Sequence, residues 1–256
     1  MPLPDLQQIV SAVTFTGVRI GGVMVFAPFT ASESISMPVK AVLTLLVTAL
    51  VYPASPVSGI AADALGWIKI AAGEAVIGMA IGLLLQFSFE AALFAGQIFG
   101  MQTGFSLITL LDPQSQADSP ALAVFMQMLA MLMFLQLNVH HWLLRGVAAS
   151  FSYLPPGTLG NLRLLSTGML QSAAGLWLAG LQMAAPVLAV TVLVDIVLGF
   201  IGKVAPQLPA TLAGLPAKTL LGLAVMALAA RSWPRLFEHQ FALGISEAER
   251  LLHLIR

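Results

Sequence analysis

Among the carboxylates that lie inside long apolar runs of the sequence, Glu90 and Asp195 are the first candidates for chemistry. Glu90 and Asp195 each interrupt a membrane-grade hydrophobic stretch. A carboxylate at hydrocarbon depth costs roughly 2.5–3.5 kcal/mol on insertion scales unless a partner meets it. Such a group indicates either a polar contact between helices or a path for an ion or substrate. For Asp195, a proton relay is one reading, and an ion pair with Lys203 is another that requires a bent helix.

A second group of candidates is Asn138, His140 and His141, which resemble metal ligands by residue type. Adjacent side chains on a helix point about 100° apart, and no carboxylate lies at a chelating offset from these histidines. Hydrogen-bonded packing residues are therefore favoured over a metal site. The chain has no cysteine, which excludes thiolate chemistry, and it carries none of the usual nucleophile, zinc, nucleotide or dinucleotide fingerprints. We expect no enzyme activity, no metal and no cofactor.

Small and polar residues alternate in one stretch with a spacing typical of helix packing. On a helical wheel, Glu90 and Gln97 fall within about 40° of each other. The whole set comprises Glu90, Gly96, Gln97, Gly100, Gln102 and Gly104, with the glycines four residues apart. Glycines at this spacing let a neighbouring backbone approach closely. The pattern favours a seam between helices, and a path lined by Glu90 is the alternative. Gln102 projects from the opposite side, which favours a setting of several helices or subunits.

Composition places these residues in a membrane protein. Of the 256 residues, 59% are hydrophobic and 9% are charged, and the mean hydropathy is +0.94. Soluble domains carry roughly 25% charged residues, so the chain lies well outside their range. Basic and acidic residues cancel at eleven each. The neutral balance and the absence of a basic tract exclude a nucleic-acid partner and leave membrane lipid as the surrounding medium.

The apolar stretches predict an all-α membrane protein with about six long, partly broken hydrophobic helices. The stretches cover residues 9–29, 39–52, 67–105, 121–151, 173–201 and the segment after Pro216. The third is too long for one upright span at about 1.5 Å per residue. Residues 112–120 are polar and bounded by prolines, which predicts a loop between helices. Residues 233–256 alternate apolar and charged positions at helical spacing and predict an amphipathic terminal helix.

The order of the motifs resembles the FliR family of flagellar and type III secretion export-gate proteins. The motifs are Phe89-Glu90-Ala91, the segment 95–106, Asp112-Pro113-Gln114-Ser115, Asn138-Val139-His140-His141, Ala205-Pro206-Gln207-Leu208 and Gly214-Leu215-Pro216-Ala217-Lys218. The Asp112-Pro113-x-Ser115 form is more similar to the flagellar branch than to the virulence branch. The chain departs from the family pattern at Val139, Lys203 and Pro209.

The resemblance implies a core subunit of the export gate of the flagellar type III secretion apparatus. With FliP-like and FliQ-like subunits it would form a closable pore for exported unfolded proteins, beside an FlhB-like gate protein. Residues 1–165 would be FliP-like, and residues 166–256 would form a FliQ-like hairpin with the amphipathic tail. The location would be the bacterial inner membrane at the flagellar basal body, with part of the complex raised toward the periplasm.

The resemblance also assigns roles to residues. The loop 105–119 would contribute to the plug of the pore, with Phe105, Ser106, Leu107, Asp112, Pro113, Gln114 and Ser115 as gating candidates. Helix and subunit packing would use the small and polar set named above together with Asn138, His140, Pro206, Gln207, Pro216 and Lys218.

Two other classes of function compete with the gate. A secondary transporter for a small solute would use Glu90 and Asp195 as coupling carboxylates, with helices broken near Pro186 and Pro206. The absence of a clear inverted repeat argues against it. A membrane scaffold without a pore is the third possibility, and its loss would misplace the apparatus instead of blocking export.

Overall fold

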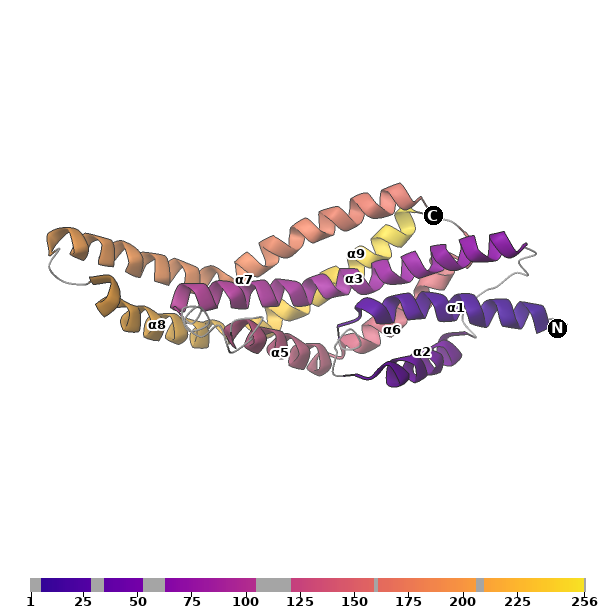
Figure 1. Cartoon of the computed structure of the whole chain (residues 1–256), viewed down its shortest axis with the longest axis horizontal. Helices are drawn as coiled ribbons and strands as arrows, with labels where there is room; N and C mark the ends of the chain where they lie inside the picture. The colour runs from indigo at the N-terminus through magenta and orange to yellow at the C-terminus, as the bar shows by residue number, and fades with distance from the viewer. Residues whose placement is uncertain are drawn as a thin grey trace. The chain divides into compact units, whose positions relative to one another are not determined.

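The computed structural model describes residues 6–28, 35–52, 63–104, 121–158, 161–205 and 210–255. Within these ranges all regular structure is helical and no strand occurs, so the predicted all-α fold is confirmed (Figure 1). The helices are α1 (Leu6–Phe26), α2 (Met37–Val51), α3 (Ala64–Thr103), α5 (Ala121–Gln136), α6 (Val139–Tyr153), α7 (Leu162–Val204), α8 (Ala210–Ala229) and α9 (Trp233–Leu254).

Two helices are longer than a bilayer is thick. α3 has 40 residues and α7 has 43. At 1.5 Å per residue these helices are about 60 Å and 65 Å long, against roughly 30 Å of hydrocarbon. α7 begins earlier than residue 173, because Asn161 accepts hydrogen bonds from the amides of Arg163 and Leu164 and so caps its first turn. It then continues through Pro186.

Three helices of the described residues are long and apolar enough to cross a membrane, or up to five if each of two bent pairs counts as one span. α1, α3 and α7 are the three. α2 is shorter, with 15 residues, and is opened by Ser36 in extended conformation and a proline in its first turn. α8 begins at Ala210, so Pro216 lies inside this helix instead of preceding it.

The fourth apolar stretch is two helices instead of one. α5 and α6 meet at an angle of 68°. The break is at Asn138, whose φ of 56° places it in the left-handed region, which asparagine tolerates better than most residues do. The amide of Asn138 still donates to the Leu135 carbonyl, and its own carbonyl accepts from His141. The chain therefore turns sharply without leaving these backbone groups unpaired.

The amphipathic tail forms α9, and its apolar face is covered by protein. Phe237, Phe241 and Leu252 are buried, whereas Arg235 and Arg250 on the opposite face are exposed. A helix of this pattern can lie on a membrane surface or close a protein core. In this chain α9 closes a core.

By contacts, the chain divides into two compact units. The first comprises Met1–Phe87, Leu135–Ala174 and Phe241–Arg256, and the second comprises Ser88–Phe134 and Gly175–Gln240. Large side chains fill each core: Phe15, Ile20, Leu85, Phe151 and Phe241 in the first, and Phe99, Met126, Phe134, Met183 and Phe237 in the second. These units follow packing, whereas the division at residue 165 follows resemblance to other subunits.

Candidate functional site

In the first unit, α1 and α3 pack backbone to backbone. A Cβ added at Gly22 would lie 2.6 Å from the Ala75 carbonyl oxygen, and one at Gly78 would overlap the Arg19 carbonyl. Gly82 meets the Val23 carbonyl in the same way. Glycine is required at these positions because any side chain would separate the two helices. The close approach brings the one basic residue of α1 directly against α3.

Arg19 is completely buried in the middle of α1. Its Nε donates to Glu74 Oε2 at 2.6 Å, forming an ion pair with α3. Its Nη1 donates to Ser150 Oγ at 3.1 Å, and its Nη2 donates to the Leu154 carbonyl at 2.9 Å. Since a buried guanidinium is tolerated only when its charge and donors are satisfied, these contacts explain how the cation is accommodated.

The guanidinium lies at the carboxyl end of α6. Its central carbon is 4.2 Å from the centre of the Phe151 ring. Ser150 Oγ in turn donates to the Val147 carbonyl at 2.6 Å. The last carbonyls of a helix have no partner within the helix and carry partial negative charge, so a cation there is favourable. Arg19, which belongs to α1, thus caps the carboxyl end of α6.

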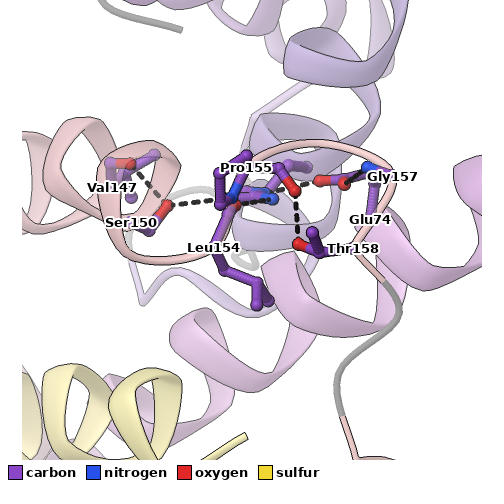
Figure 2. Close-up of polar contacts among 8 residues, drawn as sticks. Glu74, Val147, Ser150, Leu154, Pro155, Gly157 and Thr158 are labelled. Carbon is purple, nitrogen blue, oxygen red and sulfur yellow. Dashed lines mark hydrogen bonds and ion pairs between the residues drawn. The ribbon is translucent and has the colours of Figure 1, made fainter. Parts of the chain in front are cut away.

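Glu74 uses its two oxygens for two different partners and is 2% exposed. While Oε2 accepts from Arg19, Oε1 accepts from the Gly157 amide at 3.2 Å. Gly157 has a φ of 91°, a conformation that favours glycine. Figure 2 shows this carboxylate facing the turn that follows α6, with Thr158 bonded to the Pro155 carbonyl.

We call Arg19, Glu74, Ser150, Phe151, Leu154 and Gly157 the arginine cluster. The pair at its centre is neutral overall, and its hydrogen bonds to other residues go to neutral groups. A carboxylate and a guanidinium with these partners can hold α1, α3 and the end of α6 together. Within the described ranges no three His, Cys, Asp or Glu residues lie close enough to hold a metal ion.

The predicted seam residues of α3 lie in the second unit. A Cβ at Gly96 would lie 2.5 Å from the Ala123 Cα of α5, and Gly100 is buried. α7 meets α3 as well, since a Cβ at Gly180 would be 2.8 Å from the Ala91 carbonyl. Glu90, Gln97 and Gln102 are half-buried. The second half of α3 therefore has close neighbours on two helices.

Asp195 has a partner that the sequence did not indicate. Lys218 Nζ of α8 donates to Asp195 Oδ2 at 2.7 Å, with the lysine side chain 15% and the aspartate side chain 49% exposed. Lys203, which is nearer in sequence, is exposed near the end of α7. The ion pair joins α7 to α8 across the hairpin.

The remaining predicted site residues are dispersed. Asn138 is exposed at the break before α6, where the His140 ring lies 4.2 Å from that of His141. Pro216 is exposed on α8, and Gly104, with a φ of 82°, follows the end of α3. The other candidates lie outside the described residues: Phe105, Ser106, Leu107, Asp112, Pro113, Gln114, Ser115, Pro206 and Gln207.

Sequence reasoning did not select the arginine cluster as a site. A signal was present, because Arg19 and Glu74 are ionisable residues inside two different apolar stretches. Two opposite charges in separate membrane-grade helices are expected to find each other. Ser150, Leu154 and Gly157 gave no such signal, since their roles depend on where the turn lies.

These features define an all-helical membrane protein that holds buried charges for packing. A family model described as bacterial export proteins, family 1, matches residues 10–244. The flagellar biosynthetic protein FliR of Escherichia coli (strain K12) is 32% identical over 213 residues, which cover 82% of this chain and 80% of the relative. FliR of Bacillus subtilis (strain 168) is 30% identical over 193 residues, 74% of each chain. FliR of Pectobacterium carotovorum is 28% identical over 238 residues, 93% of this chain and 91% of the relative.

The chain belongs to the FliR family of bacterial export proteins, in its flagellar branch. It is accordingly a membrane protein of flagellar biosynthesis and export.

Proposed function

We propose that this chain is a core subunit of the flagellar export gate and forms a closable pore with FliP-like and FliQ-like subunits. Unfolded flagellar proteins would pass through this pore. An FlhB-like protein would lie beside it on the cytoplasmic side, and the assembly would sit in the bacterial inner membrane at the basal body. The subunit would supply a closable passage, without catalysis of its own.

The observation that carries the proposal is the outward apolar surface of α7. Only 17% of the apolar window 163–204 is buried within the chain. Its exposed side chains include Leu178, Leu193, Ile196, Phe200 and Val204. Lipid covers roughly 30 Å of an upright helix, whereas α7 is about 65 Å long, and this difference favours a cover of partner protein over the remainder. Partner subunits are the natural cover for a surface of this length.

The division into a FliP-like part, residues 1–165, and a FliQ-like part, residues 166–256, belongs to the same proposal. Contacts between α7 and α8 support the second part. The pair Asp195 and Lys218 joins the two helices, and a Cβ at Gly214 would overlap the Leu198 side chain. α7 and α8 thus behave as a close-packed hairpin, which suits a repeat of a neighbouring subunit in a ring.

The gate assembly is tested by the mass of the complex. The chain is coexpressed with FliP-like and FliQ-like subunits of a flagellar system, and the membranes are extracted in mild detergent. Native mass spectrometry is then expected to show one hetero-oligomer that contains the chain. A lone monomer would contradict the proposal. Solute uptake by the isolated chain in proteoliposomes would instead favour the transporter built on Glu90 and Asp195.

We also propose that residues 105–119 form part of the plug. The end of α3 that leads into them is anchored, because Thr219 Oγ1 of α8 donates to the Thr103 carbonyl at 2.6 Å. A segment that starts from a fixed point can open and close without displacing α3.

Deleting residues 114–117 is expected to leave the complex assembled but permeable to small ions. Conductance of the purified complex in planar bilayers measures this. A deletion of the same length in another connection, residues 57–60 between α2 and α3, is the control for the effect of shortening the chain. Unchanged conductance in an assembled complex would exclude the segment as a plug.

A further inference from the structure

The turn after α6 is held from outside by two charged side chains. Internally, the Leu154 amide donates to the Ser150 carbonyl at 2.9 Å and the Thr158 amide to the Pro155 carbonyl at 3.1 Å. Two further contacts come from distant helices: Arg19 donates to the Leu154 carbonyl, and Glu74 accepts from the Gly157 amide. The two members of one ion pair therefore form hydrogen bonds with both ends of the turn.

We propose that Arg19 and Glu74 are positioning residues that fix the turn 154–158 and so set where the chain enters α7. An apolar pair could fill the same space between α1 and α3. It could not donate to the Leu154 carbonyl or accept from the Gly157 amide. The hydrogen bonds to the turn are thus a property of the charged pair that packing alone does not explain.

The position of the turn determines the start of α7. Shortly after the turn, the Asn161 amide donates to the Ile255 carbonyl at 3.2 Å, and its side chain caps the helix. Further along, a Cβ at Gly168 would overlap the Leu251 side chain of α9. The first turns of α7 therefore pack closely against α9. Because the turn is held at both ends, α7 starts at a fixed position relative to α9.

Amide hydrogen exchange tests the proposal on the unmodified, full-length protein in mild detergent. Pro155 and Pro156 have no amide, so only the Leu154, Gly157 and Thr158 amides report on the segment. We expect the Gly157 amide to exchange at least about tenfold more slowly than an unprotected amide, because its acceptor is a buried carboxylate. Exchange of Gly157 at the unprotected rate would overturn the proposal.

Paired substitutions separate positioning from packing. The double variant Arg19→Met with Glu74→Leu removes both charges together, so no single charge is left buried. We expect it to lose the protection of Gly157 while Leu154 and Thr158, which bond within the turn, keep theirs. Arg19→Met with Glu74→Gln keeps an oxygen in place and is expected to restore part of the protection. Unchanged protection of Gly157 in the first double variant would show that packing alone places the turn.

The matched control uses the other inter-helix ion pair. Asp195→Asn with Lys218→Met removes a pair in the second unit and is expected to leave all three amides unchanged. If the Arg19 and Glu74 variants do not fold, exchange of Gly157 at the unprotected rate in the unmodified protein would still overturn the proposal. None of these measurements depends on export, so the positioning role and the gate proposal succeed or fail separately.

Discussion

At the scale of single residues, the buried ion pair lies next to the glycines at which α1 and α3 touch. Arg19 lies on α1 within one turn of Gly22, and Glu74 lies on α3 within about one turn of Gly78. Because the backbones touch at the glycines, the ion pair spans the seam at 2.6 Å. Burying a charge pair gives little net stability, but removing one member leaves an uncompensated charge and costs about 3–5 kcal/mol. The ion pair therefore contributes more to selecting this arrangement of α1 and α3 than to the net free energy of unfolding.

The glycine at the seam can be tested by a single methyl group. Gly78→Ala places a Cβ against the Arg19 carbonyl, which is backbone and cannot rotate away. We expect a loss of at least about 2 kcal/mol in the free energy of unfolding, by analogy with overpacked cores. Thermal unfolding of the detergent-solubilised protein, followed by tryptophan fluorescence, measures it.

Gly175→Ala is the control, since a Cβ there meets nothing within 4 Å. It is expected to raise stability by up to about 1 kcal/mol through helix propensity. Equal effects of the two substitutions would contradict the close contact between α1 and α3.

At the scale of helices, the break between α5 and α6 coincides with an unusual backbone conformation at Asn138. α5 and α6 would form one continuous apolar stretch if Asn138 were helical. Instead its φ of 56° bends the pair by 68°. The break contains neither proline nor glycine, and Asn138 is its one residue with a positive φ.

Substitution at Asn138 tests the cause of the bend. Asn138→Gly is expected to leave stability unchanged or slightly improved, because glycine adopts a positive φ freely. Asn138→Ala should cost about 1 kcal/mol, since the left-handed conformation is unfavourable for a residue with a Cβ. Chemical unfolding of the solubilised protein compares the two. A stabilising alanine would mean that the helices tend to straighten.

α9 provides a second test, of whether its apolar face meets protein or lipid. Phe241 is fully buried, whereas Leu243, two residues away, is 41% exposed. Phe241→Ala is expected to lower the free energy of unfolding by about 3–5 kcal/mol. Leu243→Ala, the control, should cost well under half of that. If both variants keep full stability but detach from liposomes, the helix would be a membrane-surface element.

The fold and the candidate site were predictable to different degrees. The helices could be predicted from the long apolar stretches and the amphipathic tail, because length and periodicity are local properties of a sequence. The break at Asn138 is not encoded that way, since asparagine is compatible with a helix as well as with a turn. For Asp195, local reasoning considered Lys203, whereas the partner Lys218 lies 23 positions away on the next helix. Partners of buried charges are set by tertiary packing, which a single sequence does not display.

At the scale of the whole molecule, apolar side chains are exposed on more than one helix. α2 exposes Leu45, Leu46 and Leu50, each by more than 60%, in addition to the exposed side chains of α7. A protein with such surfaces is expected to be short-lived without its partners. Pulse-chase measurement of its half-life, with and without FliP-like and FliQ-like subunits, should show at least about a threefold difference. An unchanged half-life would indicate that the chain is complete on its own.

The arginine cluster also has a consequence for the order of synthesis. Arg19 is made first, and its partner Glu74 follows 55 positions later, while Ser150 and Leu154 follow 131 and 135 positions later. Until α3 has been inserted, α1 carries an uncompensated cation at its centre, which membrane insertion disfavours. We therefore expect α1 to be less stable in the bilayer alone than it is once α3 has been made and Glu74 can pair with Arg19.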